Sequence, residues 1–175
     1  MTRQELDAKM LRLQRGDERA FEEIYRETGR GLFAYIRSLC RDYHIAEDMM
    51  QMTYIRLRTS IASYRAGGNP YAWLYTIARN ATLNEMRKRY RELSLDPDEN
   101  VSQFGTYRLN EDGSPVTEIM DKVLNETERQ IVTLHVISGF KHREIAEILE
   151  KPIGTVMWTY NNALAKMRRA LNESD

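Results

Sequence analysis

Apolar side chains recur at intervals of three and four residues along most of this chain, which is the spacing of one face of an α-helix. Leu6, Met10 and Leu13 begin the pattern, and Gly16 is placed to end the first helix. Alternating apolar and polar residues, the pattern of a half-buried strand, are hard to find. The sequence therefore predicts an all-α fold. The expected helices cover residues 6–13, 17–39 with a loosening at Gly29 and Gly31, 46–61, 70–91, 116–124, a helix that starts after Asn125, 143–149 and 153–171.

Two of these helix starts are marked by capping residues. Asn69 can accept a hydrogen bond from an unpaired backbone N–H, and Pro70 follows where no N–H is needed. Asn125 with Glu128 three residues later is typical of a capping box.

The formal net charge of zero conceals an uneven distribution along the 175 residues. Residues 1–92 carry 17 Lys and Arg against 12 Asp and Glu, a net charge of +5. Residues 93–118 carry 1 against 6, a net charge of −5, and residues 119–175 carry 8 of each sign. An acidic middle between a basic part and a neutral part favours two domains and a connecting segment.

The middle segment also lacks any sustained apolar period. It contains two prolines and two glycines, Pro97, Gly105, Gly113 and Pro115. Such a segment is typical of a linker. The predicted organisation is two small helical domains, residues 1–91 and 117–175, joined by a flexible acidic linker, residues 92–116.

Composition excludes several classes of protein. The chain has 42% apolar and 30% charged residues. No apolar run approaches the roughly 20 residues that a membrane span needs, and no signal peptide is visible. Cys40 is the only cysteine, so it is expected to be a buried apolar residue in a reducing cytoplasm. The histidines His44, His135 and His142 are scattered along the chain. They do not have the spacing of metal ligands, and no nucleophile–base pair is visible. No enzyme activity, metal, cofactor or small-molecule substrate is expected.

The C-terminal part has the pattern of a helix-turn-helix. Helix 142–149 is followed by a three-residue turn, and Pro152 stands where the next helix starts. That helix carries one apolar stripe, Ile153, Val156, Tyr160, Leu164, Met167 and Leu171. The side chains expected roughly opposite the stripe, facing outward, are Thr155, Trp158, Asn162 and Arg169. In this motif the outward face near the start of the second helix enters the major groove of DNA. A plain helical hairpin is the alternative.

Three strings follow one another along the chain: HIAEDMMQMT at 44–53, NPYAWLYTIARN at 69–80 and HREIAEILEKPIGTV at 142–156. Together, in this order, they resemble the extracytoplasmic-function (ECF) class of bacterial sigma factors, which carry RNA polymerase to promoters. The resemblance covers residues 17–91 and 117–171. It implies a region 2 that binds polymerase and the minus-ten element, and a region 4 that binds the minus-thirty-five element.

The resemblance assigns the polymerase clamp contact to Glu47, Asp48 and Gln51. A solvated helix face is the alternative for the two acids. The chain departs from the family at Met52, where a glutamate is usual, and at Arg58, where a tryptophan is usual.

The resemblance assigns promoter melting to the loop 64–69 and the helix after it. Opening a duplex needs aromatic platforms for unstacked bases and cations along the strand. The expected DNA contacts here are Tyr64, Asn69, Tyr71, Tyr75, Arg79, Asn80, Arg87 and Lys88. Trp73, in the same string, is expected to be a core residue.

The recognition helix departs most from the family, whose members usually have basic residues just after Gly-Thr-Val. This chain has Met157 and Trp158 there, so we expect weak phosphate neutralisation. Asn161 or Asn162 could read an adenine, and Trp158 could contact a thymine methyl group or another protein surface. The expected region 4 contacts are Thr155, Trp158, Asn161, Asn162, Lys166 and Arg169.

The expected partners are core RNA polymerase, through its clamp and flap, promoter DNA and an anti-sigma factor that could hold the protein near the membrane. Two other functions fit the same residues. One is a two-domain helix-turn-helix regulator. The other is a degenerate sigma-like protein that does not initiate transcription by itself.

Overall fold

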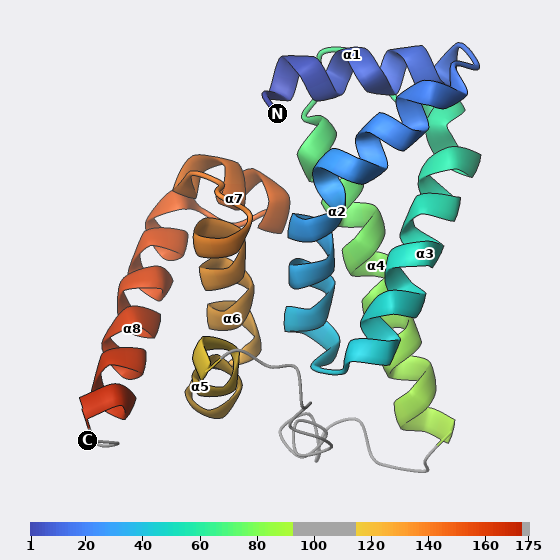
Figure 1. Ribbon diagram of the computed structural model, residues 1–175. Coiled ribbons are helices and arrows are strands. Elements are labelled where there is room, and N and C mark those ends of the chain that lie inside the picture. The colour runs from blue at the N-terminus through green and yellow to red at the C-terminus, as the bar shows by residue number, and fades with distance from the viewer. Residues whose placement is uncertain (93–114, 173–175) are drawn as a thin grey trace.

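The computed structural model describes residues 1–92 and 115–172, and every regular element in that part of the chain is helical (Figure 1). The all-α prediction is therefore confirmed. Residues 93–114, which make up most of the expected linker, lie outside the described residues. The elements are α1 (Arg3–Gln14), α2 (Glu18–Cys40), α3 (Tyr43–Ser60), η1 (Ile61–Ser63), α4 (Pro70–Glu92), α5 (Pro115–Val123), α6 (Glu126–Val132), a π-helical turn η3 (Thr133–Ile137), α7 (His142–Leu149) and α8 (Ile153–Asn172).

The predicted caps are present. The Asn69 side chain accepts a hydrogen bond from the backbone N–H of Ala72 at 3.1 Å, in the first turn of α4. At the start of α6, Asn125 and Glu128 each accept from the other's backbone N–H at 2.9 Å. These bonds satisfy donors that a helix N-terminus would otherwise leave unpaired.

The expected loosening of α2 at its two glycines is wrong, because α2 runs unbroken from Glu18 to Cys40. The glycines instead allow close approach of other elements. A Cβ at Gly29 would lie 3.1 Å from the Met50 side chain, and one at Gly31 would lie 3.0 Å from the Tyr75 hydroxyl. The helix ends where Arg41 adopts a left-handed conformation with φ of 57°.

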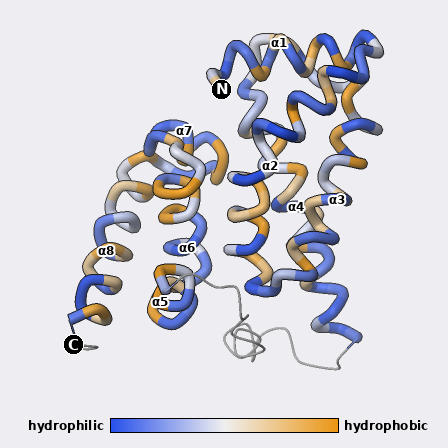
Figure 2. The backbone as a smooth tube through the Cα atoms, viewed as in Figure 1, coloured by the Kyte–Doolittle hydropathy of each residue, from blue (hydrophilic) through white to orange (hydrophobic). Residues whose placement is uncertain are grey.

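Helices α2, α3 and α4 form a bundle, and α1 lies across one end of it (Figure 1). The apolar faces of these helices turn inward, as the hydropathy colouring shows (Figure 2). Leu32, Leu57 and Leu74, one from each bundle helix, are fully buried. Burial of this kind is the main stabilising contribution to a helical bundle.

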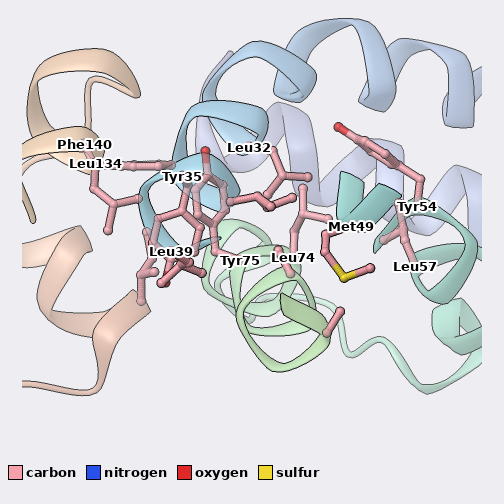
Figure 3. Close-up of a cluster of buried hydrophobic side chains, with 14 of the residues drawn as sticks. Leu32, Tyr35, Leu39, Met49, Tyr54, Leu57, Leu74, Tyr75, Leu134 and Phe140 are labelled. Atoms are coloured by element: carbon pink, nitrogen blue, oxygen red, sulfur yellow. The ribbon is translucent and has the colours of Figure 1, made fainter. Parts of the chain in front are cut away.

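The second half of the chain packs directly on α2 and α4, and the main core continues across the boundary (Figure 3). Leu134 and Phe140 of the second half belong to the same buried cluster as Tyr35, Leu39 and Tyr75 of the first half. A smaller core, formed by Met120, Leu124, Val132 and Ala163, holds α5, α6 and α8 together. The two helical parts are thus joined by a shared apolar interface in addition to the chain connection.

Helix α8 buries a different stripe from the predicted one. Val156, Thr159 and Ala163 are its buried residues, while Ile153 and Leu171 are 45% and 51% exposed. The helix packs on α7, α6 and α5, which cover only its inner face, so both ends of the predicted stripe reach solvent. Tyr160, Leu164 and Met167, in the middle, are half-buried.

Candidate nucleic-acid interface

An uninterrupted exposed strip runs along the outer side of α3. Glu47, Asp48 and Gln51 are all exposed there, and Met52 and Ile55 extend the strip as apolar residues that are 38% and 57% exposed. The opposite side of α3 supplies the buried core, so the strip is held in place by a rigid helix. Carboxylates beside exposed apolar side chains suit a basic protein surface with apolar pockets.

The loop before α4 is ordered by its own polar contacts. Tyr64 is buried and its hydroxyl donates to the carboxylate of Asp7 on α1. Burial, with Asp7 as a further cause, raises the pKa of the Tyr64 phenol. Asn69 caps α4 and its amide also donates to the Glu147 carboxylate on α7. Neither Tyr64 nor Asn69 is therefore free to contact DNA in this arrangement.

Two aromatic residues of α4, Tyr71 and Tyr75, contact the second half of the protein. The Phe140 ring meets Tyr71 edge-on at 5.0 Å and Tyr75 edge-on at 5.2 Å, between ring centroids. Tyr75 is 2% exposed and also contacts Tyr35 at 5.1 Å (Figure 3). Burial raises the pKa of Tyr71 to about 12. Both predicted stacking platforms are covered by a protein ring.

Asn80 and the predicted cations of α4 lie farther along the helix and are mostly exposed. Asn80, Arg87 and Lys88 reach solvent, and Lys88 has only a loose pair with Glu92 at 3.7 Å. Arg79 is half-buried, and its Nε has no hydrogen-bond partner among the described residues. Arg87 and Lys88 at this end of α4 are therefore exposed, whereas the Nε of Arg79 is buried. Trp73, expected in the core, is half-buried and packs against Tyr64 at 5.0 Å.

The turn before α8 has the geometry of a helix-turn-helix. Glu150 adopts a left-handed conformation with φ of 52°, and the N–H of Lys151 donates back to the carbonyl of Ala146 at 3.0 Å. At the other end of α7, the His135 and His142 rings stack at 4.5 Å. Burial, and secondarily His135, lowers the pKa of His142.

The outward face of α8 is exposed but poor in free cations. Thr155, Asn161 and Arg169 are exposed and Trp158 is 69% exposed, whereas Asn162 is half-buried. The ammonium group of Lys166 donates to Glu128 at 2.7 Å, so this cation is already neutralised. The sequence indicated only a capping role for Glu128, so its ion pair with Lys166 of α8 was not predicted.

Sequence reasoning also missed a buried charge cluster between the two halves. Asp121 of α5 pairs with Arg37 of α2 at 3.2 Å and accepts, through its backbone carbonyl, from Arg41 at 2.7 Å. Arg129 of α6 is 7% exposed and donates to the backbone carbonyls of Leu124 at 2.6 Å and Ser38 at 3.3 Å. Desolvation lowers the pKa of this guanidinium. An arginine in the middle of a helical pattern gives no sequence signal for such a role.

Within residues 1–92 and 115–172, no helix has the length and apolar character that crossing a bilayer would require.

Comparison with known proteins assigns both halves to one family. The Sigma-70 region 2 profile matches residues 24–92 and the Sigma-70 region 4 profile matches residues 122–167. The RNA polymerase sigma-H factor of Pseudomonas aeruginosa is 28% identical, over 89% of each chain. The ECF RNA polymerase sigma factor SigK of Mycobacterium bovis is 26% identical, over 97% of this chain and 95% of its own.

Two solved structures share the fold. The sigma factor RpoE of Bartonella quintana, in complex with the anti-sigma factor NepR, aligns with a TM-score of 0.67 at 28% identity, over 86% of this chain and 95% of the other. CnrH, in complex with the cytosolic domain of CnrY, aligns with a TM-score of 0.73 at 20% identity, over 97% and 98%.

The chain belongs to the ECF class of the sigma-70 family. It is a sigma factor that directs transcription initiation.

Proposed function

We propose that this sigma factor holds core RNA polymerase through the exposed strip of α3, contacts the minus-ten element with the 64–75 segment and the cations of α4, and contacts the minus-thirty-five element with α8. In this proposal residues 1–91 act as region 2 and residues 117–175 as region 4, with residues 92–116 as the linker. The protein has no catalytic role of its own.

The observation that carries the polymerase contact is the α3 strip. Asp48 is exposed on a rigid helix, with Gln51 one turn along and with Met52 and Ile55 beside them. Nothing in the described residues covers the strip, although the second half packs closely on α2 and α4.

Replacing Asp48 with arginine tests this contact. The variant reverses one charge at the centre of the strip, so we expect at least about tenfold weaker retention of core polymerase in a pull-down. Glu22→Arg, which reverses an exposed acid on α2, is the matched control and should bind core polymerase as the wild type does. Equal retention of polymerase by folded Asp48→Arg protein would place the contact elsewhere.

Run-off transcription with core polymerase and a promoter library tests the function as a whole. A sigma factor yields transcripts from a defined subset of promoters. A helix-turn-helix regulator or a degenerate sigma-like protein yields none without a second factor. The scarcity of free cations on α8 is the observation that favours the degenerate alternative.

An anti-sigma factor is the proposed regulatory partner, and the cytoplasm is the proposed location. The support is that both structural neighbours were solved with a bound protein, NepR in one case and the cytosolic domain of CnrY in the other.

A further inference from the structure

Helix α1 lies outside the segment that the region 2 profile matches, which begins at residue 24. It crosses the end of the bundle at which α3 and η1 lead into the 64–69 loop (Figure 1). Its apolar face is buried on the bundle and consists of Leu6, Met10 and Leu13. This packing does not account for a second, polar face of α1, whose side chains bond to the loop.

Three residues make up the polar face: Arg3, Asp7 and Gln14. At 100° per residue, their positions lie within about 40° of one another around the helix. Each of the three side chains forms a hydrogen bond with the 61–68 stretch, which follows α3 and precedes α4. One face of α1 therefore holds this stretch at several places, and we call the three residues the loop anchors.

Gln14 holds the start of the stretch. Its side-chain amide donates to three backbone carbonyls, those of Ile61 at 3.0 Å, Ala62 at 3.2 Å and Tyr64 at 3.0 Å. Because an amide nitrogen has only two hydrogens, the three carbonyls share them. Carbonyls at the end of a helix lack intrahelical donors, and Gln14 supplies donors from another helix.

Asp7 and Arg3 hold the rest of the stretch. The Asp7 carboxylate accepts from the hydroxyl of Tyr64 and, at 3.3 Å from each oxygen, from the N–H of Gly67. The Nε of Arg3 donates to the carbonyl of Gly68 at 3.3 Å. The α1 partner in each of these bonds is charged, which strengthens a hydrogen bond.

The anchored stretch contains a tight turn whose outer surface is exposed. The N–H of Gly68 donates to the carbonyl of Arg65 at 3.4 Å, which closes a β-turn over residues 65–68. Gly67 has a φ of 75°, and a positive φ at this position of a turn favours glycine. All four residues of the turn are exposed, so the turn is the part of the loop that a DNA strand can reach.

We propose that Gln14, Asp7 and Arg3 are positioning residues for promoter melting, which fix the 65–68 turn in the shape that receives the unstacked strand. The inference rests on the proposed role of the 64–75 segment at the minus-ten element. The loop anchors act through the loop and do not contact DNA themselves. A base that leaves the duplex needs a formed surface to receive it. A loop that is fixed beforehand loses little conformational freedom on binding, which favours capture of the strand.

Replacing Gln14 with glutamate tests this role in the holoenzyme of core polymerase and the full-length chain. Glutamate keeps the shape of the side chain, but it has no donor and turns a carboxylate toward three carbonyls. On a promoter that the wild type transcribes, we expect about tenfold fewer open complexes, as for a loop that holds its binding shape about a tenth of the time. Permanganate reactivity of unpaired thymines measures the open complexes. Retention of core polymerase should not change, because the α3 strip is untouched.

Gln4→Glu is the matched control. It adds the same charge to an exposed position of α1, outside the loop anchors, and should open promoters as the wild type does. Equal opening by Gln14→Glu and Gln4→Glu overturns the proposal. Where Gln14→Glu lowers the yield of folded protein, Tyr64→Phe provides a milder test, because it removes only the hydroxyl that Asp7 accepts from. This variant should also reduce promoter opening, and unchanged opening by it would contradict the inference.

Hydrogen exchange in the free protein separates positioning from general stability. Asp7→Ala removes the acceptor of the Gly67 N–H and leaves a residue that favours a helix. We expect faster exchange of the Gly67 amide, measured by NMR, with unchanged exchange in α2. A merely structural role would accelerate exchange across the whole bundle. Faster exchange at Gly67 together with wild-type promoter opening would show that melting does not depend on a fixed loop.

Substitutions in the turn itself separate this inference from the proposed function. Arg65→Ala removes an exposed cation, and Gly67→Ala places a side chain at a positive φ where no neighbour lies within 4 Å. If these variants reduce promoter opening and the loop-anchor variants do not, only the positioning role fails. If neither set reduces opening, the loop is not a minus-ten contact and that part of the proposed function fails as well. A wild-type holoenzyme that initiates nowhere would overturn the proposed function as a whole.

Discussion

At the scale of single residues, burial determines which bonds Arg129 must make at the interface between the two halves. Arg129 is 7% exposed, yet its guanidinium is satisfied by two backbone carbonyls and lies 3.9 Å from Asp121. A buried charge of this kind is tolerable only while those partners are present. Arg129 therefore connects α6 to α2 through its hydrogen bond to the carbonyl of Ser38.

Replacing Arg129 with alanine should lower the free energy of unfolding by about 2–4 kcal/mol, because two buried carbonyls and part of the Asp121 charge lose their partner. Urea denaturation followed by circular dichroism measures the change. Arg56→Ala, an exposed position on α3, should change stability by no more than about 0.5 kcal/mol. Equal urea midpoints for Arg129→Ala and Arg56→Ala would show that Arg129 contributes little to the free energy of unfolding.

Cys40 offers a pH-dependent test of burial. Burial raises the pKa of its thiol to about 11, from an ordinary value of 9.0. Reaction with a thiol reagent at pH 8 should therefore be slow in the folded protein and fast in urea, since the thiolate is the nucleophile. The unfolded chain ionises first as pH rises, so the contribution of this group to stability is present below about pH 9 and lost between about pH 9 and 11. Because Cys40 is the only cysteine, the labelling rate reports on it alone. Rapid labelling of the native protein would contradict its burial.

At the scale of elements, the register of α8 decides which asparagine can read DNA. Asn161 is exposed and Asn162 is half-buried, next to the buried Ala163. A bidentate contact with an adenine requires the whole amide to reach the groove. The arrangement favours Asn161 as the reader, although the sequence allowed either.

Asn161→Ala should relax preference at one base position of the upstream element by about 1–3 kcal/mol, while Asn162→Ala should have the smaller effect. Transcription from promoters randomised at that element, with wild type and both variants, measures this. Neither substitution should alter retention of core polymerase, which serves as the control. A larger effect from Asn162→Ala would show that α8 rotates about its axis when the protein binds DNA. Unchanged preferences in both variants would indicate that α8 mainly binds protein.

At the scale of the whole molecule, the two halves associate through a shared core. Tyr35 donates to Gln130 at 3.2 Å, and Leu134 and Phe140 join the core of the first half (Figure 3). Apolar burial of this kind does not need the covalent connection to persist.

Cutting the chain between the halves should therefore leave them together. With a specific protease site introduced among residues 93–114, we expect the two fragments to co-elute in size-exclusion chromatography after cleavage. Leu134→Ala, which opens a cavity in the shared core, should weaken that association and serves as the comparison. Separate elution of the wild-type fragments would show that the linker alone keeps the halves close. We also expect limited proteolysis of the intact protein to cut first within residues 92–116, the predicted linker.

The sequence by itself determined the helices and the family. The Asn69 and Asn125 caps and the turn at Glu150 are local properties, set within a few residues of the chain, and the structure confirms them. The apolar spacing predicted the helices, although α8 buries a different stripe from the predicted one. The exposure of Glu47, Asp48 and Gln51 also follows locally, because they lie opposite the apolar face of their own helix.

Only the tertiary structure decided which of the candidate DNA-contact residues are exposed and which are covered by other side chains. Tyr71, Tyr75 and Asn69 look like DNA contacts in the sequence, yet Phe140 and Glu147, 65 to 78 residues away, cover them. Lys166 is neutralised by Glu128 from another helix in the same way. Such contacts depend on how helices pack across long sequence separations, and neither propensity nor periodicity encodes which faces will meet.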